Sequence, residues 1–223
     1  MSVSDVEILG QTKDKLIQRK QEWARDGRLL TGDQKIEDRT ERLPPGQRRV
    51  TDWPVLDLGL QPSVPLEKWR LTVDGLIENP VLWSWEDLNA QPAFEDVSDI
   101  HCVTSWSRFD NYWEGVATAH LLALVKPKPE ARHVIMHSYD GYTTNVTLEA
   151  FGAADALIAY RWEGGPIVRQ HGGPVRLVIP QCYFWKSPKW IERIELVEEE
   201  RRGFWESRGY HNVGDPWKQQ RYG

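Results

Sequence analysis

The sequence predicts an α+β fold built on a mixed β-sheet, with strands outnumbering helices. Two observations support this prediction. Several segments alternate apolar and polar residues with the period of two that half-buried strands have, and turn signals such as Asp-Gly and Gly-Gly-Pro bound them. These segments do not alternate with long helical segments, as they would in a doubly wound α/β fold.

The regular part of the chain begins with a strand in which Trp69, Leu71 and Val73 alternate with polar residues, and it ends at an Asp-Gly turn. A short helix is expected at 84–90, with Ser84 placed as its N-cap. The next strand, 97–103, brings Cys102 to its end. The polar run directly after it, Thr-Ser-Trp-Ser-Arg-Phe-Asp-Asn, is expected as a loop, where functional residues often gather.

Further along, a helix is expected at 118–126, with Thr118 as cap and Lys-Pro-Lys-Pro as its stop. Two strands flank Tyr-Asp-Gly, which is typical of a strand–turn–strand unit. The remaining elements are a short helix at 148–155 and strands at 156–162, 167–180 and 189–199, the second of these containing a glycine-rich loop. The aromatic tail after them is expected to wrap around the domain.

Composition limits the function. The chain has 223 residues, 40% of them hydrophobic and 27% charged, which suits one large globular domain. A net charge of −5 offers no basic field for nucleic acid. No stretch is apolar for long enough to span a bilayer, and the first residues lack the pattern of a signal peptide, so a cytoplasmic location is expected.

Two parts are expected. Residues 1–50 are highly charged and predict an arm with a short, weakly amphipathic helix, while residues 51–223 predict one domain. The segment Trp-Pro-Val-Leu-Asp-Leu-Gly-Leu, which starts at Trp53, is too apolar for a free linker and is expected to lie against that domain.

Cys102 is the first candidate for chemistry, because aromatic and polar residues surround it in the sequence. Three interpretations stay open at this point: a buried inert thiol, a nucleophile with a histidine base such as His137 or His171, and a soft thiolate ligand for a metal. A zinc site at His133 and His137 is a weaker alternative, because their spacing suits a helix and the segment reads as a strand.

A second set of residues indicates an anion site. His171 and Arg176 flank two glycines, which permit close approach of a ligand to the backbone. Lys186, Ser187 and Lys189 then cluster in one short turn, where ammonium groups, a hydroxyl and free backbone N–H groups could hold one phosphate.

The ordered set HCVTSW, SYDGYTT, HGGPVRLVIP and KSPKWIERIEL resembles the molybdopterin-binding domain of the sulfite oxidase family, in its stand-alone bacterial form. The resemblance runs from Trp53 to the tail motif FWESRGYHNVGDPW. It implies Mo-molybdopterin with one pyranopterin in the mononucleotide-free form, and a molybdenum held by the pyranopterin dithiolene and one cysteine thiolate.

The resemblance also implies roles for individual residues. Cys102 matches the metal ligand. Apart from the resemblance, Arg108 is the candidate for drawing an anionic or polar substrate to the pocket, with an ion pair to Asp110 or another carboxylate as its alternative. The residues that match cofactor contacts are Trp53, Pro54, Val55, Leu56, Ser138, Asp140, His171, Arg176, Lys186, Ser187 and Lys189.

The sequence departs from the family at several points. It has no haem-binding domain and no immunoglobulin-like domain, and Arg202 falls near the position of the family's active-site tyrosine. The implied activity is oxygen-atom transfer on a small-molecule substrate, with electrons passing to a separate partner. The alternatives are a non-catalytic molybdopterin-binding module and a metal-free thiol enzyme that uses Cys102.

Overall fold

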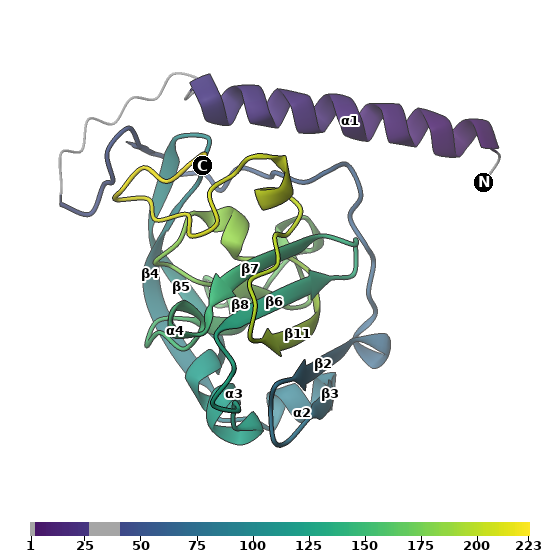
Figure 1. Ribbon diagram of the computed structural model, residues 1–223, viewed down its shortest axis with the longest axis vertical. Helices are drawn as coiled ribbons and strands as arrows, with labels where there is room; N and C mark the ends of the chain where they lie inside the picture. The colour runs from purple at the N-terminus through teal and green to yellow at the C-terminus, as the bar shows by residue number, and fades with distance from the viewer. Residues whose placement is uncertain (1–2, 27–40) are drawn as a thin grey trace.

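The computed structural model describes residues 3–26 and 41–223, with side chains described from residue 13 to 25 and from residue 41 onward. Two β-sheets pack against each other, and a long helix, α1 (Val3–Asp26), lies across one end of the molecule beside the C-terminal tail (Figure 1). In each sheet one strand pair is parallel and the others are antiparallel. The predicted α+β class with mixed pairing is therefore confirmed, although the strands form two mixed sheets instead of one.

The six-stranded sheet carries the loop that holds Cys102. Its centre is a long antiparallel pair, β4 (Phe94–His101) with β5 (Trp106–Ala117). Beyond β5 the order continues through β8 (Leu157–Trp162) to β10 (Arg176–Val178), with β9 (Gly165–Pro166) beside β8. On the other side β1 (Arg48–Arg49) runs parallel to β5, so the chain before residue 51 already contributes to this sheet.

The five-stranded sheet has the order β3–β2–β11–β6–β7. Its central strand, β11 (Ile191–Val197), is parallel to β2 (Arg70–Gly75) and antiparallel to β6 (His133–Ser138). The edge strands are β3 (Val81–Ser84) and β7 (Thr143–Thr147). These strands follow the expected alternation; in β2, for example, Leu71 and Val73 are both fully buried.

Short helices connect the strands. The capping box that Ser84 forms with Asp87 starts α2 (Trp85–Asn89), as predicted. The other α-helices are α3 (Thr118–Val125) and α4 (Leu148–Phe151), and the 3₁₀ turns are η1 (Leu66–Lys68), η2 (Arg169–His171), η3 (Phe184–Lys186) and η4 (Glu206–Arg208).

Around β8 and β10 both faces of the six-stranded sheet are buried, which explains the continuous apolar run of Leu157, Ile158 and Ala159. Ile158 and Leu177 face the five-stranded sheet, whereas Leu157, Ala159 and Val178 face the opposite way. That second face is covered by the segment around Trp53, the C-terminal tail and α1. The pocket described below lies in this second layer.

Three local predictions were wrong. The helix of the N-terminal arm spans 24 residues instead of being short. The polar run after Cys102 is not a loop beyond Ser105, because its residues form the first half of β5 and pair with β4. Thr118 does not cap α3: its hydroxyl donates to the carbonyl oxygens of Phe151 and Ala156, and the N-cap is Ala117. The extended arm expected before residue 50 falls partly on residues 27–40, outside the described residues.

Candidate functional site

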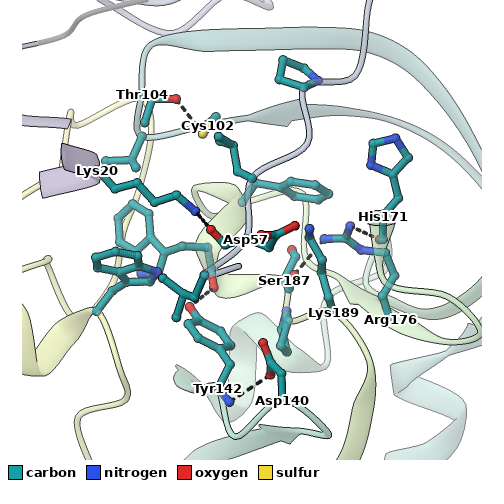
Figure 2. A pocket seen from close by; sticks show the side chains of 18 of the residues that line it. Lys20, Asp57, Cys102, Thr104, Asp140, Tyr142, His171, Arg176, Ser187 and Lys189 are labelled. Carbon is teal, nitrogen blue, oxygen red and sulfur yellow. Dashed lines mark hydrogen bonds between the residues drawn. The ribbon is translucent and has the colours of Figure 1, made fainter. Parts of the chain in front are cut away.

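A pocket opens between the turn that follows β4 and the turns around β10 and β11. It is lined by side chains from seven parts of the chain: Lys20 of α1 and segments within 53–58, 102–106, 140–142, 171–176, 184–190 and 205–210. Most of its walls are aromatic or aliphatic. The polar groups gather at two places, Cys102 on one side and the group of His171, Arg176 and Lys189 on the other (Figure 2).

Cys102 sits in a tight turn between β4 and β5. Its amide donates to the carbonyl of Trp106 at 2.8 Å, and its own carbonyl accepts from the amide of Ser105 at 3.0 Å and from Gln47 Nε2 at 3.0 Å. These bonds fix the backbone, and the side chain, 7% exposed, faces the pocket. Sγ lies 3.1 Å from the hydroxyl oxygen of Thr104.

Burial raises the pKa of the Cys102 thiol above its usual value, because a thiolate is poorly solvated there. Among the described side chains, Thr104 is the hydrogen-bond partner of Sγ, and no histidine bonds to it. A free nucleophile needs the opposite conditions, namely a lowered pKa and an adjacent base. A bound metal cation would stabilise the thiolate directly, so the site suits a metal ligand better than a nucleophile.

His137, one of the two histidines considered as a base for Cys102, lies in β6 and does not line the pocket. Its Nε2 is 3.4 Å from a carboxylate oxygen of Glu195 on the neighbouring strand. Within the part of the chain that the structure describes, no three His, Cys, Asp or Glu side chains gather as a metal site, so His133 and His137 gain no further ligand for zinc. Cys182 is also a free, buried thiol, and it lies in the layer between the sheets.

His171 and Trp53 form a flat wall of the pocket. Their rings are parallel within 3° and their centroids are 3.9 Å apart. Burial, with Arg176 and Lys189 nearby, lowers the pKa of His171 to about 4, so the imidazole is neutral at physiological pH. A neutral stacked pair of this kind suits contact with a flat heterocycle.

Arg176 is 1% exposed and is held by backbone carbonyls. It donates to the carbonyl oxygens of His171 at 2.7 Å and Ser187 at 2.8 Å, and its guanidinium carbon lies 4.2 Å from the ring centroid of Phe184. The side chain therefore ties the glycine loop to the turn that follows η3. Burial lowers its pKa to about 9, so the guanidinium stays charged at neutral pH.

Lys189 packs closely against Gly172 in the glycine loop. A Cβ atom on Gly172, whose φ is +106°, would lie 2.8 Å from Cβ of Lys189, so glycine is required for this approach. Burial and the nearby Arg176 lower the pKa of Lys189 to about 7. Its Nζ donates to the carbonyl of Gln170 at 2.7 Å, which leaves two further N–H donors for an anion in the pocket.

The structure brings most of the predicted residues together. Nine of them line the pocket: Trp53, Pro54, Leu56, Cys102, Asp140, His171, Arg176, Ser187 and Lys189. The hydroxyl of Ser187 accepts from the amide of Ile179 at 2.9 Å, and Asp140 accepts from the amide of Tyr142 at 3.0 Å. Burial raises the pKa of Asp140.

Four predicted residues lie outside the pocket lining. Val55 is 40% exposed, and Ser138 is buried without a hydrogen-bond partner for its hydroxyl among the described residues. Lys186 points away from the pocket into a fully buried ion pair with Glu206, 2.6 Å away. Arg108 pairs with Glu163 at 3.2 Å and lies over the ring of Trp162, so its alternative role is correct in kind, with Glu163 in place of Asp110.

Several pocket residues were not predicted. Trp205 and Tyr210 of the tail form one wall of the pocket with stacked rings. Arg202, which the sequence places near the position of the family's active-site tyrosine, is exposed. Asp57 and Tyr142 also line the pocket, and both adjoin segments that the sequence analysis singled out. Lys20 could not have been found, because it is one of many charged residues on the N-terminal helix.

The chain is similar to known proteins in sequence and in fold. The family model described as "Oxidoreductase molybdopterin binding domain" matches residues 59–205. The chain is 45% identical over 195 residues to the "Uncharacterized oxidoreductase YuiH" of Bacillus subtilis (strain 168), a match that covers 87% of this chain and 98% of that protein. It is 29% identical over 180 residues to "Sulfite oxidase" of Arabidopsis thaliana, covering 65% of this chain and 46% of that protein.

Among solved structures, the sulfane dehydrogenase SoxCD from Paracoccus pantotrophus matches with a TM-score of 0.57 and 21% identity, over 62% of this chain and 40% of that one. At this identity the match concerns the fold alone. The chain thus spans nearly all of the Bacillus protein but less than half of the plant enzyme and of the SoxCD chain.

Proposed function

The chain belongs to the sulfite oxidase family of molybdopterin-binding oxidoreductases, and from this premise we propose that it transfers an oxygen atom to or from a small substrate at a molybdenum held by Cys102. The family membership makes it an oxidoreductase with Mo-molybdopterin as cofactor. The Cys102 ligand, the oxygen-atom transfer and the mononucleotide-free form of the cofactor are the proposal.

One observation carries the proposal: a buried sulfur atom and a group of cationic side chains face the same pocket. Cys102 supplies the sulfur, and Arg176 with Lys189 supplies positive charge for a phosphate. Trp53 and His171 form a flat wall of the same pocket. The residues present therefore fit a group that has a soft metal, a flat heterocycle and a terminal phosphate.

When bound, the cofactor supplies the two-electron redox chemistry. The protein's part is to bind, orient and exclude water. Arg176 and Lys189 would hold the phosphate, with the hydroxyl of Ser187 beside them. The hydrogen bonds of the turn at Cys102 fix the position of Sγ, and the rings of Trp106, Trp205 and Tyr210 shield that side of the pocket from solvent.

A metal-free thiol enzyme receives less support. Its nucleophile would be a thiol whose pKa burial raises. Of its two candidate bases, His137 lies outside the pocket beside Glu195, and His171 makes no hydrogen bond to Sγ among the described side chains. The non-catalytic module is disfavoured by the family membership, because the family is one of oxidoreductases.

The oxygen transfer is tested with the molybdenum-loaded protein in ¹⁸O-labelled water. A panel of small oxyanions, including sulfite, is offered to the oxidised protein with an artificial electron acceptor, and a panel of small sulfoxides to the chemically reduced protein. We expect at least one substrate to turn over, with one labelled oxygen in an oxidised product or one oxygen lost from a reduced one. Turnover in which no oxygen is gained or lost would contradict the proposal.

Two further points belong to the proposal. Electrons would pass to a separate partner protein, as the sequence leads us to expect, and cell fractionation would test the expected cytoplasmic location. No helix among the described residues is long and apolar enough to cross a membrane.

A further inference from the structure

Helix α1 packs against the wall of the pocket that the tail forms. The hydroxyl of Tyr222 donates to the carbonyl of Gln21 at 2.7 Å, and Gln21 Nε2 donates to the carbonyl of Arg208 at 3.1 Å. Ile17 and Ala24 are 7% and 1% exposed, so one face of the helix is buried. The part of the chain that matches the family model begins at residue 59, so α1 lies outside it.

This packing places Lys20 inside the pocket. Its Nζ donates to the backbone carbonyl of Asp57, and the residue is 9% exposed. Figure 2 shows the side chain extending from the helix toward Asp57, with Cys102 beside it. Burial lowers the pKa of Lys20 to about 8, and the charges of Asp57 and Cys102 partly offset this effect. Burying a lysine is unfavourable, and the carboxylate of Asp57, which also lines the pocket, offsets only part of this cost.

The three cationic side chains in the lining are divided between two ends of the pocket. Arg176 and Lys189 lie beside His171 and Ser187, where the phosphate of the cofactor would bind. Lys20 lies on the Cys102 side, and Asp57, whose carboxylate interacts electrostatically with both Lys20 and Lys189, lies between these two lysines (Figure 2). The phosphate therefore does not account for Lys20. One N–H of its ammonium is used by the carbonyl of Asp57, and two remain for a ligand.

We propose that Lys20 is a substrate-binding residue, which α1 delivers to the metal side of the pocket to hold a small oxyanion. This inference rests on the proposed function, because it names the charge that would meet the substrate of that site. It assigns the N-terminal helix a direct part in the active site: the pocket is complete only when α1 is packed against the tail.

The test uses the oxidised, molybdenum-loaded full chain and inorganic sulfate as the probe. Calorimetric titration gives the sulfate Kd of the wild type and of Lys20→Met, Lys20→Gln and Lys20→Arg. The glutamine amide can still donate to the carbonyl of Asp57 but carries no charge. Lys15→Met is the matched control, because Lys15 is exposed on the same helix. Molybdenum content and hydrogen exchange of the α1 amides are measured for each variant.

We expect Lys20→Met and Lys20→Gln to weaken sulfate binding by about 10-fold or more, as the loss of a charged hydrogen-bond donor does. The sulfate Kd of Lys20→Arg and of Lys15→Met should stay within about threefold of the wild-type value, because both variants keep a positive charge in the pocket. Molybdenum content should not change. Exchange protection of α1 should persist at least in Lys20→Gln, which separates the loss of charge from the loss of the helix.

Wild-type sulfate affinity in molybdenum-loaded Lys20→Gln, or no sulfate binding by the loaded wild type, would overturn the inference and leave the proposed function standing. Wild-type protein without molybdenum would overturn the proposed function itself, and the role of Lys20 with it.

Discussion

Replacing Cys102 with serine is expected to lower activity by at least about 100-fold, since loss of even an outer-shell partner of a metal ligand costs 10- to 100-fold. A serine hydroxyl lacks the soft sulfur that would bind molybdenum, so the absorption from the cysteine thiolate to the metal should disappear, whereas that from the dithiolene sulfurs should remain. The pterin should be largely retained, because His171, Arg176 and Lys189 face a different part of the pocket. Kinetics, absorption spectra and fluorescence of the oxidised pterin provide the readouts.

The chain provides a matched control in its other cysteine. Cys182 is also buried and free, but it packs in the layer between the two sheets and does not line the pocket. Cys182→Ser should keep the absorption band and the activity and lose only stability, by about 1–3 kcal/mol for the buried hydroxyl. Full activity in Cys102→Ser with an unchanged absorption band would rule out Cys102 as the metal ligand.

The largest expected loss of stability follows from removing Lys186. Its ammonium lies 2.6 Å from Glu206 and also donates to the carbonyl and the side-chain oxygen of Asn145, and both members of the ion pair are fully buried. Lys186→Met leaves the Glu206 carboxylate buried with Thr144 and Trp185 as its donors. We expect unfolding free energy to fall by about 3–5 kcal/mol, as when one partner of a buried pair is removed.

Urea unfolding measures this effect, and two further variants define its cause. Lys218→Met removes an ion pair with Asp215 in which the lysine side chain is 72% exposed, and it should change stability by less than about 1 kcal/mol. The double variant Lys186→Met with Glu206→Met should recover much of the loss, because no charge is left unpaired. If the unfolding free energy of Lys186→Met fell by less than about 1 kcal/mol, the buried ion pair would not contribute to stability as expected.

The fold could be predicted largely from local patterns. Alternation identified β2 and β11, and the Tyr-Asp-Gly turn identified the β6–β7 hairpin, because each signal lies within a few residues. The errors arose where contacts between residues far apart in the sequence determine the local structure. The first half of β5 is polar in sequence but pairs with β4 along its length, and Thr118 bonds to carbonyls more than 30 residues away instead of capping its helix.

The same distinction holds for the pocket. Cys102 follows the end of a strand, and His171 and Arg176 flank two glycines, so local patterns mark all three. Lys186 and Lys189 stand three residues apart in one motif, yet one is buried against Glu206 and the other lines the pocket, and no local pattern separates them. Lys20 depends on how α1 packs on the tail, a contact of nearly 200 residues' separation, so the sequence alone could not identify it.

The most direct test of the account is the molybdenum and pterin content of the purified protein, made in a molybdate-supplied host that synthesises the cofactor. Elemental analysis and fluorescence of the oxidised pterin are read from the same sample. The account predicts about one molybdenum and one pterin per chain, because the proposed site has one pocket and one cysteine, Cys102, to hold one metal. Folded protein with neither molybdenum nor pterin would contradict it and leave the buried Cys102 without its proposed role.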